Sequence, residues 1–310
     1  MVNFSLFPNW GTIDFFVLPG FRERTFPSVD GRLRFPLPVD NSQAQYESGA
    51  GRKHADWVVR YSHALGAFDL GVSHFSGTSR EPRLLPRSDK EGNNVLTPMY
   101  DLMDQTSLDL QYTIGGWLWK MGLISRKARQ RRMTAFVAGF GYTFVNIRDS
   151  GIDLGVITEY IFDDRDSHSF APTPLDDDIF VGMRLAFNNV QSTELLVGTI
   201  IDRKNASSFL NLEASRRVGS AFKTTLEIRW FVNTDDLDFL YAFRKDTYAR
   251  MELAHSNAGR KDHALVTNGI MNNIPNFFCR HIAHQETNCS SSRGLADKIR
   301  VQSLGARQHR

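Results

Sequence analysis

The chain has 310 residues, of which 41% are hydrophobic, 23% are charged and 12% are aromatic, with 23 Phe. No stretch of about eighteen apolar residues exists, which excludes a transmembrane helix but leaves one large domain or two ordinary domains open. The net charge of +3 is unevenly placed, because residues 255–310 carry +5 and the preceding 254 residues carry −2. The excess of basic residues therefore lies in the C-terminal tail and indicates no nucleic-acid partner.

Apolar and polar residues alternate in run after run along most of the chain, and each run predicts a β-strand. Successive side chains of a strand face opposite sides of a sheet, so each strand would have one apolar and one polar face. The clearest run is Phe222–Asn233, where Leu226 and Trp230 point one way and Lys223 and Glu227 the other. The thirteen predicted strands are Val2–Phe7, Thr12–Leu18, Asp56–Ala64, Phe68–Ser76, Thr106–Ile114, Trp117–Ser125, Met133–Ile147, Ile152–Phe162, Ile179–Asn188, Thr193–Asp202, Ser208–Arg217, Phe222–Asn233 and Thr247–Ala254.

The connections between these strands alternate in predicted length. Short ones lie at 8–11, 65–67, 115–116, 148–151, 189–191 and 218–220, and longer ones lie at 19–55, 77–105, 126–132, 163–178, 203–207 and 234–246. Outer-membrane barrels have short turns at one end and long loops at the other. A soluble sandwich has no reason to keep its long loops at one end. We therefore expect residues 1–254 to form an all-β, antiparallel, up-and-down transmembrane β-barrel.

Both ends of the chain depart from this expectation. Bacterial single-chain barrels have even strand numbers, and no secretory signal precedes the first predicted strand. We therefore expect the barrel to be incomplete, with a signal peptide and at least one strand lost by truncation. Residues 255–310 are rich in Ser, Asn, His and Arg without a sustained period, so a disordered or frame-shifted tail is predicted there.

Three segments carry a resemblance to a known class of protein: Thr12–Pro27, Asp69–Pro82 and Ile152–Arg165. They resemble Gram-negative outer-membrane β-barrel proteins, and look closest to an uncharacterised porin-like group. The resemblance covers roughly residues 1–254 and is specific to the architecture, not to a substrate. It implies an outer-membrane location, with membrane lipid, lipopolysaccharide and the barrel assembly machinery as partners and with an unknown oligomeric state.

The polar positions of the predicted strands carry acidic and basic residues in mixture, and are expected to line the lumen. These residues are Arg60, Asp69, Asp109, Gln111, Lys120, Asp153, Glu159, Arg184, Asn211, Glu213, Arg217, Lys223, Glu227, Arg229, Arg250 and Glu252. In a wide barrel they would border a wet channel and tune its selectivity. In a narrow barrel they would instead pair across the interior and hold it closed.

Aromatic residues near strand ends are expected at the membrane–water interface, where amphipathic rings are favoured. These residues are Trp57, Tyr61, Trp117, Trp119, Tyr142, Tyr160, Trp230 and Tyr248. Alternation alone leaves open whether the apolar wall faces lipid or forms the core of a soluble barrel.

Five cations within the predicted loop 126–132 would contact lipopolysaccharide phosphates or simply be solvated. They are Arg126, Lys127, Arg129, Arg131 and Arg132. Acidic clusters at 163–166 and 176–178 flank another predicted loop, and such clusters can hold calcium, although these lack the regular spacing of a dedicated site.

No metal, cofactor or catalytic residue is assigned from the sequence. In the tail, Cys279, His281, His284 and Cys289 match no standard zinc spacing. Elsewhere His63 and His74 each follow a serine, but adjacent strand residues face opposite sides and cannot form a catalytic pair. An enzyme is therefore not expected.

Three functions fit these patterns. The first is a porin-like channel for passive passage of small solutes. The second is a non-conducting surface barrel whose loops bind lipopolysaccharide or a partner. The third is a soluble β-barrel or sandwich that binds a ligand in an apolar interior.

Overall fold

The computed structural model describes residues 1–255 except 32, 167 and 237, so the predicted tail, with its cysteines and histidines, lies outside the described residues. The large sheet consists of β1 (Val2–Leu6), β2 (Thr12–Pro19), β4 (Ala55–Leu65), β5 (Phe68–Thr78), β8 (Leu102–Ile114), β9 (Trp117–Ala128), β10 (Arg131–Phe144), β11 (Asp153–Asp163), β12 (Asp177–Ala186), β13 (Glu194–Asp202), β14 (Ser208–Val218), β15 (Phe222–Asn233) and β16 (Tyr248–His255). A small second sheet consists of β3 (Gln45–Tyr46), β6 (Arg83–Ser88) and β7 (Asn94–Tyr100).

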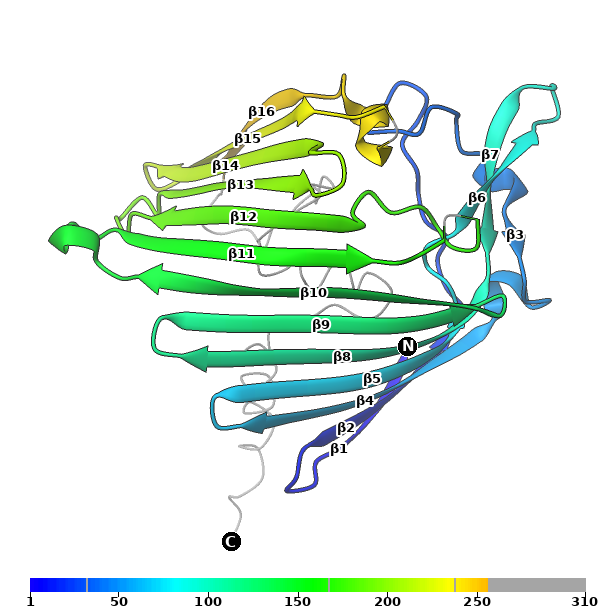
Figure 1. Ribbon diagram of the computed structural model, residues 1–310, viewed down its shortest axis with the longest axis horizontal. Helices are drawn as coiled ribbons and strands as arrows, with labels where there is room; N and C mark the ends of the chain where they lie inside the picture. Colours follow the sequence, from blue (N-terminus) through cyan, green and yellow to red (C-terminus); the bar gives the residue numbers. More distant parts are fainter. Residues whose placement is uncertain (32, 167, 237, 256–310) are drawn as a thin grey trace, which may run out of the picture. The chain divides into compact units, whose positions relative to one another are not determined.

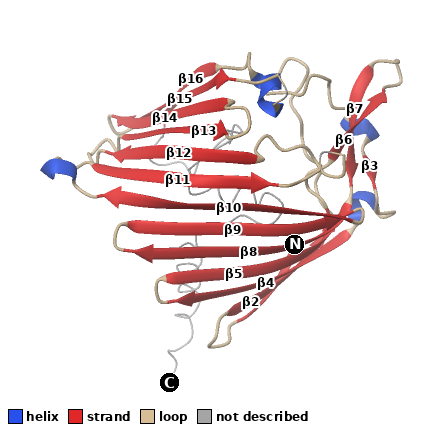
Figure 2. Ribbon diagram, viewed as in Figure 1, coloured by secondary structure: helices blue, strands red, loops and turns tan. Residues whose placement is uncertain are grey.

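The helices are short and lie in the connections (Figure 2). They are the 3-10 helices η1 (Asn41–Gln43), η2 (Gly51–Lys53), η3 (Ile147–Asp149) and η4 (Phe239–Phe243). Within the described part of the chain, no helix has the length and apolar character needed to cross a membrane.

The strands of the large sheet are antiparallel and follow chain order, and the small sheet takes β3 from the β2–β4 connection and β6 and β7 from the β5–β8 connection (Figure 1). The order runs β1-β2-β4-β5-β8-β9-β10-β11-β12-β13-β14-β15-β16, which makes thirteen strands. The sequence prediction of an all-β protein with thirteen antiparallel strands is confirmed. In residues 1–255, no pairing joins β1 to β16, so closure of the sheet into a transmembrane barrel stays a prediction.

The connections of the large sheet fall at its two ends. We call the end with the connections 20–54, 79–101, 129–130, 164–176, 203–207 and 234–247 the loop end. The opposite end, with 7–11, 66–67, 115–116, 145–152, 187–193 and 219–221, is the turn end. Glycine permits the tightest turns there, because Gly66 and Gly115 adopt φ values of 63° and 56° that other residues rarely adopt.

The predicted long loop at 126–132 is wrong. Strands β9 and β10 continue toward each other and leave only Arg129 and Gln130 as a turn, both with positive φ (47° and 64°). Left-handed conformations at both central residues are typical of the two-residue hairpin turn that matches strand twist. The basic run concealed this turn because neither position is occupied by the expected Asn, Asp or Gly.

The small sheet was missed by the sequence reading, which treated residues 77–105 as a loop. Strands β6 and β7 pair through six residues each and turn at 89–93, where Asp89 accepts hydrogen bonds from the backbone of Glu91 and Asn93. Strand β3, from the preceding long connection, joins β7 in parallel. An Asp-led turn between two alternating runs is a hairpin signal that the sequence did contain.

Replacing Arg129 and Gln130 together by Asn and Gly should stabilise the protein by about 1 kcal/mol, because both residues avoid the steric cost of left-handed backbone. The midpoint of urea unfolding measures the change. As a control, the Gln130→Val substitution should destabilise the same turn, since a β-branched side chain tolerates positive φ poorly. Equal midpoints for the two variants would contradict the turn geometry.

Candidate functional site

Cross-strand partners share a face of a sheet, so the register assigns every strand residue to one of two faces. We call the face that carries Arg60 the polar face and the face that carries Trp57 the apolar face. All sixteen residues that were expected to line a lumen lie on the polar face. Seven of them are basic and seven are acidic, but all large-sheet strand residues on this face together include thirteen acidic and nine basic residues, so acidic residues are in modest excess.

Arg60 of β4 and Asp109 of β8 form a bidentate ion pair across the strand that separates them. Nη1 of Arg60 donates to Oδ1 of Asp109 at 2.8 Å, and Nη2 donates to Oδ2 at 2.9 Å. The pair passes directly over Gly71 of β5, where any Cβ atom would collide with both groups. Glycine at this position makes room for an interaction that spans three strands.

A second group of charges lies across β14, β15 and β16. The side chain of Arg229 is buried, donates from Nε to Glu227 at 2.6 Å and lies 3.6 Å from a carboxylate oxygen of Glu213. The hydroxyl of Tyr248 donates to the same Glu227 carboxylate at 2.6 Å. Tyr248 is the register partner of Arg229 and therefore lies on the polar face, not with the interface aromatics as predicted. Tyr248 lies two residues before Arg250, and residues two apart on a strand share a face, so the sequence already indicated the polar face.

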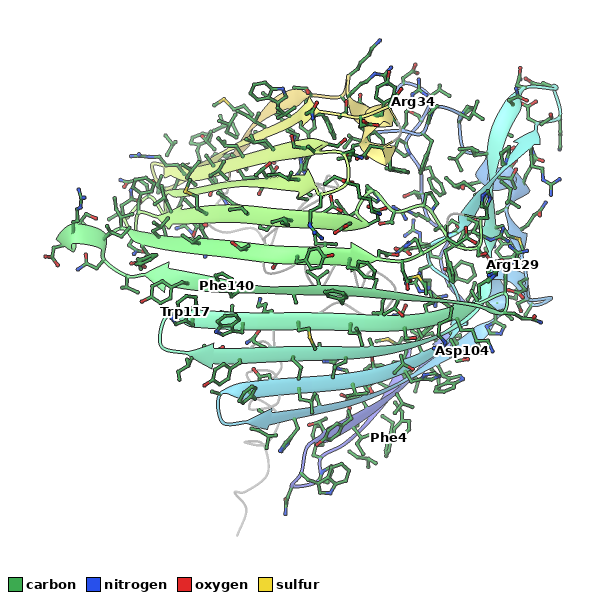
Figure 3. The ribbon with its side chains drawn as sticks, viewed as in Figure 1. Phe4, Arg34, Asp104, Trp117, Arg129 and Phe140 are labelled. Atoms are coloured by element: carbon green, nitrogen blue, oxygen red, sulfur yellow. The ribbon has the colours of Figure 1, made fainter. Side chains whose placement is uncertain are left out.

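The other seven predicted interface aromatics lie on the apolar face and gather toward both ends of the strands. Near the turn end are Tyr61, Trp117, Trp119 and Tyr142, and near the loop end are Trp57, Tyr160 and Trp230. Figure 3 shows Trp117 and Phe140 side by side on neighbouring strands, where their ring centroids are 5.8 Å apart. Trp117 also contacts Tyr142 at 4.8 Å, so the rings form a continuous cluster.

The apolar face is exposed over nearly its whole extent. Every large apolar side chain of the large-sheet strands that is prominently exposed lies on this face, and such residues occur on twelve of the thirteen strands. They include Phe4 at 60%, Met183 at 47%, Trp230 at 53% and Met251 at 73%. This exposure distinguishes the apolar face from the core of a soluble sheet, where such side chains are covered.

Charged residues are excluded from the middle of the apolar face. Within the strands that the structure describes, Asp, Glu, Lys and Arg occur on this face only within three residues of a strand end. These residues are Asp104, Lys127, Arg132, Asp177 and Arg216. The face therefore has an uncharged central band, bordered by aromatic rings and then by charges.

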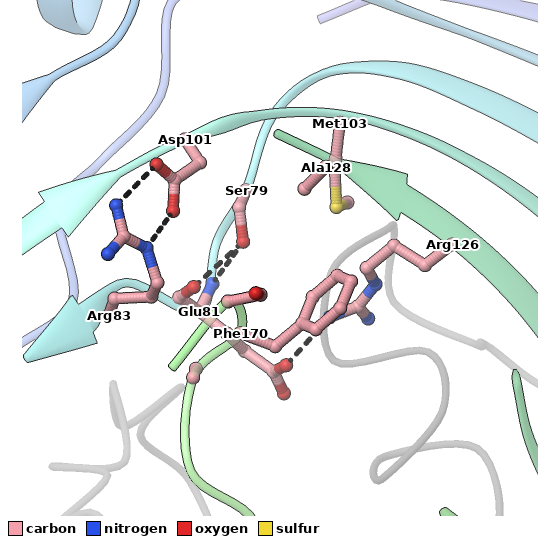
Figure 4. Close-up of a pocket in the computed structure, with 10 residues that line it drawn as sticks. Ser79, Glu81, Arg83, Asp101, Met103, Arg126, Ala128 and Phe170 are labelled. Carbon is pink, nitrogen blue, oxygen red and sulfur yellow. Dashed lines mark hydrogen bonds and ion pairs between the residues drawn. The ribbon is translucent and has the colours of Figure 1, made fainter. Parts of the chain in front are cut away.

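Ion pairs hold two of the long connections against the loop end of the sheet, and Figure 4 shows one of these pairs, between Glu81 and Arg126. Glu81, between β5 and β6, accepts from Nη1 of Arg126 at 3.1 Å and from Nη1 of Arg165 at 3.4 Å. Arg126 belongs to β9 and also donates to Gln105 of β8 at 2.8 Å. Arg165, between β11 and β12, is held by Asp163 at 2.6 Å. One carboxylate thus links two connections to the central strands.

Arg83 and Asp101 form a further pair beside this group, with Nε and Nη2 of Arg83 at 2.6 and 2.9 Å from the carboxylate. Hydrogen bonds from this guanidinium to Asp101 raise the pKa of Arg83 above its ordinary value. Burial lowers the pKa of Arg165, but hydrogen bonds and the charges of Asp163 and Glu81 outweigh that effect and raise it overall. Both guanidinium groups therefore remain charged.

Two cavities adjoin these ion pairs. The first, shown in Figure 4, has a volume of about 10 Å³, so it holds about one water molecule and no organic ligand. The second has a volume of about 360 Å³ and is mostly apolar. Its walls come from four parts of the chain and include Phe35, Leu84, Leu96, Phe170 and Phe239. Arg83 lines both cavities and is already paired with Asp101.

The connections at the loop end also contact one another. Tyr46 stacks on Tyr100 with ring centroids 5.6 Å apart, which fastens connection 20–54 to β7. The backbone nitrogen of Leu33 donates to Asp246 at 3.1 Å, and Phe35 contacts Phe239 with centroids 6.0 Å apart. Connection 20–54, which follows β2, therefore reaches the connection that precedes β16.

The predicted basic loop is divided by the hairpin. Arg126 is buried on the polar face, where it is paired with Glu81, and cannot contact an external phosphate. Lys127, Arg129, Arg131 and Arg132 remain exposed around the β9–β10 turn. The prediction of one continuous basic patch is wrong, because β-pairing sends alternate residues to opposite faces.

Sequence reading missed Glu81, Arg83, Asp101 and the inward role of Arg126. Nothing in their local spacing indicated the pairing, since the partners lie 18 residues or more apart in the sequence. The expected separation of Ser73 from His74 is confirmed: Ser73 bonds to Ser107 at 2.5 Å and His74 to Thr106 at 3.0 Å.

No protein-family model matches the chain, and no curated protein matches it. The contrast between the two faces and the contacts at the loop end are therefore the basis for assigning a function.

Replacing Glu81 by Gln should lower the free energy of unfolding by about 3 kcal/mol, because two buried guanidinium groups lose their shared countercharge. The matched control is Glu194→Gln, which breaks a half-exposed pair with Arg184 and should cost at most about 1 kcal/mol. Urea unfolding followed by tryptophan fluorescence measures both. A loss for Glu81→Gln no larger than the control would show that the cluster does not fix the connections.

Proposed function

We propose that this chain is a porin-like β-barrel of the Gram-negative outer membrane, with its apolar face against lipid and its polar face along a route for small solutes. The uncharged central band of the apolar face carries the proposal. A charge at the middle of a bilayer costs about 2–4 kcal/mol on a barrel surface, which accounts for the exclusion of charges from this band. Water would exert no such selection.

Strand length and aromatic placement support the same proposal. The ten strands from β4 to β15 in the large sheet have 9 to 14 residues. A tilted transmembrane strand needs about 9–11 residues. Trp and Tyr at both ends of the band would sit at the two lipid–water boundaries, where an aromatic ring meets apolar tails and a polar group meets water.

A soluble ligand-binding barrel fits these features less well. Such a protein would bury its apolar face and place its polar face in water. Here the apolar face is exposed, and the polar face holds partly buried ion pairs such as Arg60–Asp109 and Arg229–Glu227. An exposed apolar surface across a whole sheet would drive aggregation in water.

The modest excess of acidic residues on the polar face favours a route with weak selectivity for cations. The strands of the large sheet place thirteen acidic and nine basic residues on this face. A pore that strongly selects ions of one sign needs rings of residues that carry the opposite charge. We therefore infer that small neutral, zwitterionic or cationic solutes are favoured over anionic ones.

A second candidate function is a membrane-embedded barrel that does not conduct. The contacts among the connections at the loop end favour it, because Glu81 and Arg165 join one pair of connections and the Leu33–Asp246 bond joins another pair. In that case the exposed cations Lys127, Arg129, Arg131 and Arg132 would contact lipopolysaccharide phosphates.

Leu226→Arg should reduce insertion into lipid vesicles strongly, because it puts a charge in the apolar band at a cost of about 2–4 kcal/mol. The matched control is Thr225→Arg, the neighbouring half-buried residue on the polar face, which should insert like the wild-type chain. Vesicle flotation after refolding measures both. Recovery of the wild-type chain in the aqueous phase without detergent, or equal insertion of both variants, would contradict a lipid-facing apolar face.

Planar-bilayer recordings of the inserted protein should show conductance with a cation-to-anion permeability ratio modestly above one, reflecting the modest excess of acidic residues on the polar face. Lys223→Glu should shift the ratio toward cations, whereas Lys127→Glu, on the apolar face, should leave it nearly unchanged. Membrane insertion without conductance would contradict the channel and favour the second candidate.

A further inference from the structure

Three carboxylates converge at the loop end between β12 and β13. Asp176 directly precedes β12, Asp178 is the second residue of that strand, and Asp202 is the last residue of β13. One carboxylate oxygen from each lies within 4.8 Å of the other two. Asp178 and Asp202 are register partners, so β-pairing itself places these two acids side by side on the polar face.

Local backbone contacts fix the orientation of two of these side chains. Oδ2 of Asp178 accepts from the backbone nitrogens of Asp176 and Asp177 at 2.8 and 3.2 Å. Oδ1 of Asp202 accepts from the backbone nitrogens of Lys204 and Asn205 at 2.6 and 3.0 Å. One oxygen of each carboxylate is thereby anchored, and the second oxygen is left to interact elsewhere.

The remaining oxygen of Asp178 is the informative one. Asp178 is only 1% exposed, and its Oδ1 atom is buried without a hydrogen-bond partner among the described residues. Its neighbour Asp202 is 7% exposed. Burying a carboxylate oxygen without a partner, next to a second buried carboxylate, is costly unless a cation or a proton lies between them.

The nearby basic side chains do not reach this oxygen. Nζ of Lys204 lies 2.8 Å from Oδ2 of Asp176, and both side chains are about half exposed. Arg203 instead pairs with Asp177 at 2.8 Å, and Asp177 faces the apolar side of the sheet. With Lys204 counted, the three carboxylates retain two negative charges, which matches one divalent cation.

We propose that Asp176, Asp178 and Asp202 bind a hard divalent cation, with calcium as the favoured ion. The donors are all carboxylate oxygens, which suit calcium and magnesium and not the softer transition metals. Calcium tolerates the irregular geometry of a site assembled from a strand start and a strand end, whereas magnesium demands a near-octahedral one. The bound ion would join the connection before β12 to the β13–β14 turn. The site depends neither on conduction nor on insertion into a membrane.

Isothermal titration of the full chain in detergent micelles with calcium chloride tests the site. We expect one calcium per chain, at least tenfold weaker binding for Asp178→Asn and for Asp202→Asn, and unchanged binding for Asp177→Asn. The last variant removes the same charge from the adjacent residue of the same strand, on the opposite face. Lys204→Gln should bind calcium more tightly, because it removes the competing ammonium group from Asp176.

Several results would overturn the proposal. Absence of calcium binding to the wild-type chain would do so, as would a loss in Asp177→Asn equal to that in Asp178→Asn. If Asp178→Asn fails to fold, Lys204→Gln still decides the matter, since unchanged or weaker binding there contradicts a site at Asp176. A thermal unfolding temperature that responds to pH between 6 and 8 but not to calcium would show that a shared proton balances the buried pair.

Discussion

The register of the large sheet is the constraint on which the other features depend. Its antiparallel strands keep one unbroken alternation from β1 to β16, apart from an irregularity at Ser208 and Phe209. A slip by one residue in any strand would send its apolar set to the other face. Leu226 and Arg229 on one strand, for example, would exchange the apolar and the polar face. The separation of charge from apolar surface is therefore a property of the pairing as a whole.

Small residues on the polar face allow its larger side chains to lie flat across the strands. A Cβ at Gly71 would displace the Arg60–Asp109 pair, and Cβ atoms at Gly182 and Gly198 would both meet the ring of Phe180. Ion pairs in this setting form between strands, as Arg60 and Asp109 do, and also along one strand, as Arg229 and Glu227 do. They reduce the number of unpaired charges on the polar face.

Period-two alternation was sufficient to predict the thirteen strands and the face of each expected lumen residue, because that information is local. What could not be predicted depends on partners far apart in sequence. Asp202 joins Asp178 only through the register, and Glu81 meets Arg126 and Arg165 only once two connections are folded against β9. The Arg129–Gln130 turn was hidden because its residues lack the usual preference for positive φ. Tyr248 was predicted at the membrane interface because it is aromatic, although its position two residues from Arg250 indicates the polar face.

The contact between the second and last connections also bears on the order in which the chain folds. Each strand of the large sheet pairs with its neighbour in the strand order, so the sheet can grow by adding one hairpin after another at low entropic cost. The bond from Leu33 to Asp246 joins residues 213 apart and has no such local route. It can form only after every strand between them is in place. That bond would therefore be among the last steps of folding, and its formation would report that the whole sheet has been assembled.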